Sequence, residues 1–106
     1  MFGKVTIGDK EIEMVGNAAT PYRYQAIFHE DYLKTVTGKS DTDPNDFFAK
    51  LGFVMAMQAS KKDMSKITAE TFYKWLEQFE PGEVYSATGE IADLYNGNTE
   101  SSVDPK

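Results

Sequence analysis

Apolar and polar residues alternate along the first part of the chain, on both sides of a Gly-Asp pair at positions 8 and 9. A period of two is typical of strands with one buried face, and a short turn between two such runs is typical of a hairpin. The apolar positions that share this face are Val5, Ile7, Ile12 and Met14. We therefore expect a β-hairpin over residues 2–15. Because two strands alone are marginally stable, the hairpin should pack on other elements.

Four later segments carry the signals that start and stop helices. Proline follows a capping residue at Thr20-Pro21 and again at Asp43-Pro44, which favours a helix start at each proline. Gly38, the Pro81-Gly82 pair and Gly97 are stop signals. The predicted helices cover residues 21–37, 44–59, 69–80 and 83–95.

The last two predicted helices each carry an apolar stripe at spacings of three and four residues, which indicates one buried face per helix. The stripes are Phe72, Trp75, Leu76 and Phe79, and then Val84, Ala87, Ile91, Leu94 and Tyr95. At 106 residues the chain has the length of one domain. The predicted fold class is α+β, mainly α: an N-terminal β-hairpin packed on a small bundle of about four helices. We expect one globular domain over residues 1–96 and a polar, disordered tail over 97–106.

The helix predicted over residues 44–59 is apolar on two sides. One broad face contains most of its large residues, namely Phe47, Phe48, Leu51, Val54 and Met55, and we assign it to the core. Phe53 and Met57 point to another side of the helix. Two interpretations remain open: either neighbouring helices cover both sides, or the second side is a partner-binding face. Gly52 would let another helix approach closely in either case.

His29 is the only histidine, and it stands next to Glu30 and Asp31. Consecutive helical residues point about 100° apart, so these three side chains cannot close on one metal ion. Asp31 falls among apolar positions, so we expect either a half-buried carboxylate with a partner such as Arg23 or a backbone amide, or a kink in the helix. A structural carboxylate is favoured over a catalytic one. We expect His29 to be a surface or interface residue. We predict neither a metal site nor a catalytic site here.

Composition narrows the function classes further. Seventeen acidic and eleven basic residues give a net charge of −6, which disfavours binding to nucleic acid or to anionic membranes. There is no cysteine, no phosphate-binding glycine loop and no complete calcium loop, because the stretch around Asp43 contains a proline and reads as a helix cap. We therefore predict a protein that is not an enzyme and that needs no cofactor.

Four stretches of the sequence resemble the tail assembly chaperones of long-tailed phages and prophages of Gram-positive bacteria. They are TPYRYQAIFHEDYLKTVTG, FFAKLGFVMAMQA, FYKWLEQFEPGEVY and the short acidic helix that follows, and together they cover roughly residues 17–95. The short hairpin ahead of the helices is similar to that family too.

The resemblance implies a non-enzymatic assembly factor in the cytoplasm of the bacterial host that is absent from the mature virion. Such chaperones coat the tape measure protein, keep its apolar helices soluble and help recruit tail tube subunits. Self-association is a further possibility. If this function is right, the partner-binding residues are those outside the predicted core: Phe53, Met57, Tyr73 and Tyr85.

Members of the family commonly make a second, longer product by a programmed ribosomal slip near the end of the short reading frame. Asp104, Pro105 and Lys106 permit a slippery codon sequence, which is a hypothesis that the coding DNA tests. Two other functions remain as alternatives: a virion structural or tail completion protein, and a small acidic regulatory module that binds a compact protein.

Overall fold

The computed structural model describes residues 2–32, 34 and 43–97. A hairpin of β1 (Phe2–Ile7) and β2 (Lys10–Val15) comes first. It is followed by the helices α1 (Thr20–Phe28), α3 (Pro44–Ala59), α4 (Ala69–Leu76) and α5 (Glu83–Asn96), with a 3-10 turn, η1 (Met64–Lys66), before α4. The predicted class, an α+β fold that is mainly α with an N-terminal hairpin on a helical bundle, is confirmed.

The hairpin has the predicted register. Its strands are antiparallel, with Phe2 opposite Val15 and Ile7 opposite Lys10, and the two-residue turn begins at Gly8 with a φ of 65°. That φ is in the left-handed region that glycine adopts readily. The odd-numbered positions of β1 and the facing positions of β2 point toward the helices, so Val5, Ile7 and Met14 are buried.

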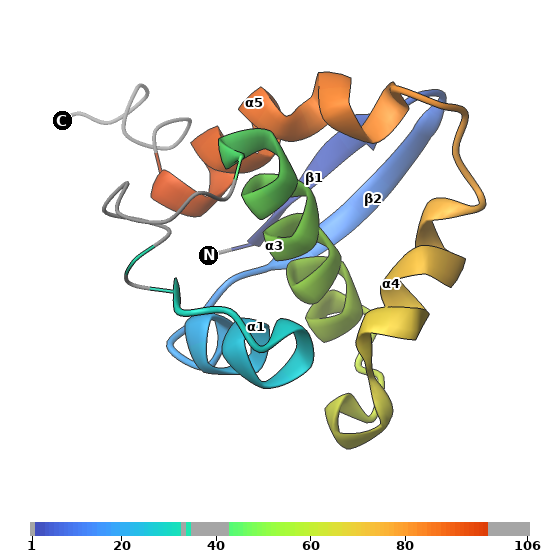
Figure 1. Cartoon of the computed structure of the whole chain (residues 1–106). Coiled ribbons are helices and arrows are strands. Elements are labelled where there is room, and N and C mark those ends of the chain that lie inside the picture. Colours follow the sequence, from blue (N-terminus) through green and yellow to red (C-terminus); the bar gives the residue numbers. More distant parts are fainter. Residues whose placement is uncertain (1, 33, 35–42, 98–106) are drawn as a thin grey trace, which may run out of the picture.

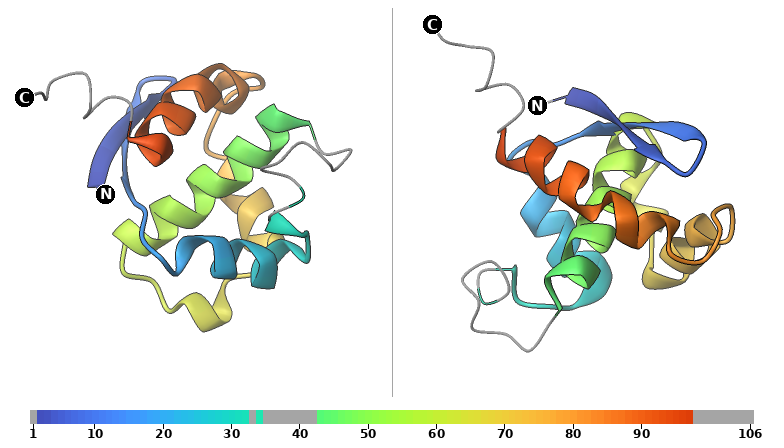
Figure 2. Two further views of the ribbon diagram at one scale, coloured as in Figure 1. Left: turned by 90° about the vertical axis from the view of Figure 1, so that its left-hand side faces the viewer. Right: turned by 90° about the horizontal axis from the view of Figure 1, so that it is seen from above.

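The central element is α3, with the other helices and the hairpin arranged around it (Figures 1 and 2). It starts as predicted: the Asp43 side chain accepts a hydrogen bond from the Asn45 amide at 2.9 Å, and Pro44 is the first helical residue. β2 packs against α3, and β1 packs against α5. The predicted close approach at Gly52 is also present, because a Cβ there would lie 2.8 Å from Cδ1 of Ile91 on α5.

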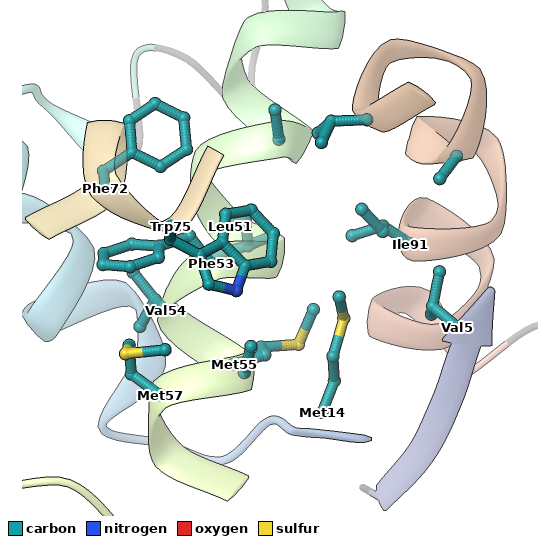
Figure 3. Packing of buried hydrophobic residues seen from close by; sticks show 14 of the residues in the cluster. Val5, Met14, Leu51, Phe53, Val54, Met55, Met57, Phe72, Trp75 and Ile91 are labelled. Atoms are coloured by element: carbon teal, nitrogen blue, oxygen red, sulfur yellow. The ribbon is translucent and has the colours of Figure 1, made fainter. Parts of the chain in front are cut away.

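The core surrounds the middle of α3, where every residue from 51 to 57 is buried. Side chains of the hairpin, α4 and α5 around this part of α3 are seen in Figure 3, and α1 contributes to the same cluster. The neighbours that contribute most of this cover are Val5, Ile7, Met14, Tyr24, Ile27, Phe72, Trp75, Val84, Ala87, Ile91 and Leu94. The two-sided apolar pattern of this helix therefore reflects neighbours on both sides.

The first helix ends much earlier than predicted. It spans Thr20–Phe28 instead of residues 21–37, and Ala19 is its N-cap in place of Thr20. His29 adopts the left-handed conformation, with φ 58° and ψ 38°, and its amide bonds to the Gln25 carbonyl, which closes the helix. Beyond this point Glu30 turns inward to polar partners that a straight helix would not let it reach. The predicted stop at Gly38 and the tail from residue 98 lie outside the described residues.

The third predicted helix also ends early, whereas the fourth matches closely. α4 stops at Leu76, not at residue 80. The amides of the next three residues bond to carbonyls three positions earlier in the chain; the Phe79 amide, for example, donates to the Leu76 carbonyl at 3.0 Å. Such bonds tighten the last turn and end a helix. α5 runs one residue past its predicted end and stops at Gly97, whose φ is 75°.

Candidate partner-binding surface

Two of the four residues predicted to bind a partner are in the core. The side chains of Phe53 and Met57 are 0% and 7% exposed. The Phe53 ring lies 5.3 Å from the ring of Phe72 and 5.5 Å from that of Trp75, both on α4 (Figure 3). The prediction that Phe53 and Met57 lie outside the core is therefore wrong. Of the two interpretations left open for this side of α3, cover by neighbouring elements is the one observed.

The other two predicted residues are exposed. Tyr73 on α4 is 57% exposed and Tyr85 on α5 is 52% exposed. Both helices are placed by local features of the sequence. The Thr68 amide bonds to the Thr71 hydroxyl at 3.1 Å where α4 begins, and α4 is held to the core by Phe72 and Trp75. Tyr73 therefore projects from the outer side of a helix whose inner side is buried.

The turn from α4 into α5 is built from a Pro-Gly pair and two glutamates. Gly82 has a φ of 90°, which favours glycine, and directly precedes α5. The Glu83 amide bonds to the Glu80 carbonyl at 3.1 Å, and the Glu83 carboxylate accepts from the Glu80 amide at 2.9 Å. These reciprocal bonds hold the two helices at a wide angle to each other, as Figure 1 shows.

A groove of about 300 Å³ lies in the angle between the ends of these two helices. Most of its lining is apolar. The lining residues are Leu76, Phe79, Glu80, Pro81, Gly82, Val84 and Tyr85. Tyr85 thus joins the groove to the exposed surface of α5, and an apolar groove of this kind is a usual docking site for one face of a helix. We call it the α4–α5 groove.

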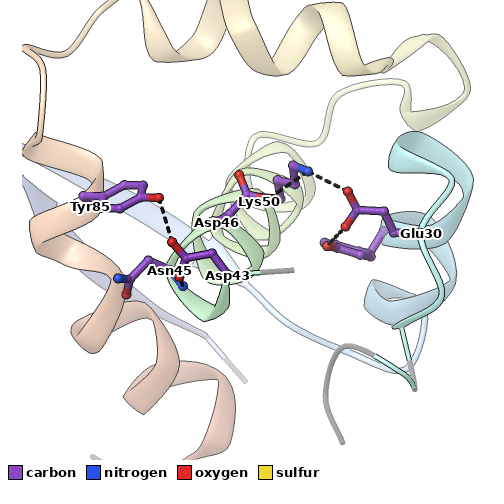
Figure 4. Close-up of polar contacts among 7 residues, drawn as sticks. Glu30, Asp43, Asn45, Asp46, Lys50 and Tyr85 are labelled. Carbon is purple, nitrogen blue, oxygen red and sulfur yellow. Dashed lines mark hydrogen bonds and ion pairs between the residues drawn. The ribbon is translucent and has the colours of Figure 1, made fainter. Parts of the chain in front are cut away.

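The position of Tyr85 is fixed by a bond to the start of α3. Its hydroxyl donates to Oδ2 of Asp43 at 3.1 Å, and the other oxygen of Asp43 caps α3 (Figure 4). The hydrogen bond and the charge of Asp43 raise the pKa of the Tyr85 hydroxyl above its ordinary value. The hydroxyl of Tyr85 is therefore held as a hydrogen-bond donor to Asp43.

Charge is distributed unevenly along the chain. From residue 69 to residue 97 the sequence has six acidic residues, Glu70, Glu77, Glu80, Glu83, Glu90 and Asp93, and one basic residue, Lys74. This segment therefore carries five of the six net negative charges of the chain. It consists of α4, the turn and α5, so the apolar α4–α5 groove is set in the most acidic part of the molecule.

The cluster around Glu30 has a structural role. The Glu30 carboxylate accepts a hydrogen bond of 2.5 Å from the Tyr24 hydroxyl and pairs with the Lys50 ammonium at 2.7 Å, while Lys50 also pairs with Asp46 at 3.0 Å (Figure 4). Burial opposes the ionisation of Glu30, but the bonds from Lys50 and Tyr24 outweigh it and lower the pKa of Glu30 below its ordinary value. This network anchors the end of α1 to α3.

The residues beside Glu30 differ from the predicted roles in part. His29 is exposed, as expected, and closes α1 through its left-handed backbone. Asp31 is also exposed, so the expectation that it is half buried is wrong, because α1 has already ended before it. Its carboxylate does accept from a backbone amide, that of Lys34, at 3.1 Å. Arg23 bonds to Gln58 at 2.9 Å.

Sequence reasoning missed the groove itself. It assigned Leu76 and Phe79 to a fully buried stripe, because it continued α4 to residue 80. In the structure both side chains are only partly buried, and Phe79 lies in the turn beyond the helix. The acidic residues on both sides of Phe79, in the stretch EQFEPGE, are the signal that could have indicated a surface position.

Within the described residues, no group of three or more histidine or acidic side chains is placed to hold a metal ion. None of the helices described there has the length and the hydropathy needed to cross a bilayer. Comparisons of the chain with protein-family models, with curated proteins and with solved structures found no match.

Proposed function

We propose that this chain is a non-catalytic phage tail assembly chaperone, which binds the tape measure protein, keeps it soluble and helps recruit tail tube subunits. The observation that best supports the proposal is the α4–α5 groove, with Tyr85 in its lining and Tyr73 exposed on the neighbouring helix. An exposed apolar groove between helices suits a protein whose task is to cover apolar helices of another chain.

The size of the groove agrees with a reversible cover. At about 300 Å³ it admits only part of one helix face, so a single contact is weak and a later subunit could displace it. Many copies along one long partner would together keep that partner soluble. The net charge of −6 would limit aggregation within such a coat.

The location and the remaining partners belong to the same proposal. The chain acts in the cytoplasm of the bacterial host during tail assembly and is left out of the mature virion. Its partners are the tape measure protein and the tail tube protein, with self-association along the tape measure as a further contact. A longer frameshifted product would link the cover to the tube subunits.

Co-expression with the tape measure protein tests the proposal. We expect the tape measure protein to become soluble and to co-purify with several copies of this chain. Tyr85→Ala should reduce the co-purified amount, whereas Tyr22→Ala, which changes an aromatic residue that is 74% exposed on α1, should not.

An insoluble tape measure protein, in the presence of both the short chain and the longer product, would refute the proposal. Recovery of the chain from purified virions would favour the structural or tail completion alternative instead. Capture of a single compact regulatory protein in equal amount would favour the regulatory module.

A further inference from the structure

We propose that the α4–α5 groove selects an amphipathic helix whose apolar stripe is flanked by lysine or arginine residues. The inference rests on the proposed function for the class of partner, a helical segment of another protein. It adds the chemistry by which this chain would choose one segment over another. The argument uses the lining of the groove and the charges around it.

The lining fixes the apolar part of the ligand. Leu76 and Phe79 come from α4 and the turn, and Val84 and Tyr85 come from the first turn of α5. Two converging helix ends leave a concave surface, which suits side chains at positions i, i+3 and i+4 of a docked helix. A strand would present alternate side chains to opposite faces and would fill such a groove less well.

The carboxylates around the groove fix the polar part of the ligand. Glu80 lies in the lining, and Glu77 is exposed just before it. Within the described residues, no ion pair engages either of these two carboxylates; the ion pairs there involve Lys4, Lys10 and Lys50. No base in the described part of the chain is paired with them, so their charges remain available to a cation of the partner.

This arrangement discriminates in two directions. A partner with lysine or arginine beside its apolar stripe gains attraction at the rim and associates faster. A partner with glutamate at the same positions would be repelled by the carboxylates of this chain, and this repulsion would add to the selectivity. Because the rim is exposed to solvent, the selectivity should weaken as salt increases.

Two designed peptides of about 18 residues, long enough to form isolated helices, would test the selectivity. Both have leucine on one face at helical spacing, and one has lysine at its flanking positions where the other has glutamate. We expect the full chain to bind the lysine peptide about tenfold more tightly in low salt, with most of this preference lost at about 500 mM salt. Fluorescence anisotropy of labelled peptides gives the two dissociation constants.

A pair of charge variants locates the effect. Glu77→Gln with Glu80→Gln removes the carboxylate in the groove lining and the exposed one three residues before it, and Glu11→Gln with Glu13→Gln removes two exposed charges on β2. Both variants change the net charge equally. We expect only the groove variant to lose the preference for the lysine peptide. Amide chemical shift changes on binding should centre on Leu76, Phe79 and Tyr85.

Three results would overturn the inference: equal affinity for the two peptides, an equal loss of preference in both charge variants, or shift changes away from the groove. The outcome is separable from that of the proposed function. If the peptides are selected at the groove but the tape measure protein stays insoluble, the function fails and the binding chemistry stands. If the groove charge variant solubilises the tape measure protein normally, the function stands and the groove selectivity is refuted.

Discussion

Replacing Phe53 by alanine tests whether α3 is enclosed by α4. The Phe53 side chain is 0% exposed, and its ring contacts three others, those of Phe28, Phe72 and Trp75, at centroid distances from 5.3 to 6.2 Å. If the ring is removed, α4 loses its aromatic contacts with α3 and α1 loses the one from Phe28. The contact of Tyr24 on α1 with Phe47 on α3, at 5.1 Å, remains. The substitution therefore removes the middle of a cluster rather than a peripheral contact.

The expected cost follows from burial and from the cavity that is left. Transfer of a phenylalanine side chain from water contributes about 1.5–3 kcal/mol, and truncation of a buried phenylalanine to alanine costs about 3–5 kcal/mol once the cavity is included. The free energy of unfolding of a domain of this size is about 5–15 kcal/mol. Phe53→Ala should therefore leave a marginally stable fold. Phe53→Asp also buries an unpaired charge and should abolish the fold.

Urea denaturation, followed by the fluorescence of Trp75 and by far-ultraviolet circular dichroism, measures the loss. Trp75 is the only tryptophan and lies next to Phe53, so its emission reports on this part of the core. Tyr73→Ala is the control, because Tyr73 is an aromatic residue on α4, the helix that carries Trp75, and is 57% exposed. It should change the free energy of unfolding by no more than about 0.5 kcal/mol. A loss below about 1 kcal/mol for Phe53→Ala would refute the enclosed α3 and restore this side as a binding face.

Three further predictions concern contacts between elements. The fold lowers the pKa of Glu30 from its ordinary value of 4.5, so the ionised Glu30 stabilises the protein above that pH, and this stabilisation is lost as the pH falls through the lowered pKa. In urea titrations the wild type should therefore lose more free energy of unfolding than Glu30→Gln between about pH 6 and about pH 3. Gly52→Ala places a Cβ 2.8 Å from Cδ1 of Ile91 and should cost about 1–2 kcal/mol, with a smaller cost in an Ile91→Val background, as measured in a double-mutant cycle. Asp43→Ala removes the cap of α3 and should reduce the free energy of unfolding by about 1 kcal/mol, which thermal denaturation would show as a lower melting temperature. Asp43→Asn should preserve most of the cap.

The elements that were predicted correctly have local signals. α3 begins at the residue indicated by Asp43 and Pro44, and the hairpin follows from alternation around a Gly-Asp turn. The end of α1 could not be predicted in the same way. It depends on Glu30, which bonds to Tyr24 within α1 and to Lys50, twenty residues further along the chain. A contact between residues so far apart in sequence cannot be read from the local pattern of apolar and polar residues.

The candidate site was predicted only in part, for a related reason. A helical projection shows which residues share a side of α3, but it does not show which neighbour covers that side. Phe53 and Met57 were therefore placed outside the core, although Phe72 and Trp75 of α4 pack on Phe53 and the Met57 side chain is buried as well. Tyr73 and Tyr85 were correctly expected outside the core, because α4 and α5 lie at the periphery and have one buried face each. Their role in binding stays a prediction.

Because the middle of α3 is enclosed, the residues that stabilise the fold differ from those that we propose bind a partner. Core substitutions such as those at Phe53 would reduce binding only by unfolding the chain, so they cannot identify a binding surface. The carboxylates of Glu77 and Glu80 lie at the surface, and changes there should leave the free energy of unfolding nearly unchanged. A change of Tyr85 also removes its hydrogen bond to Asp43 at the start of α3, so its unfolding must be measured alongside binding. A binding defect in a variant of these residues that unfolds normally can therefore be attributed to the groove itself.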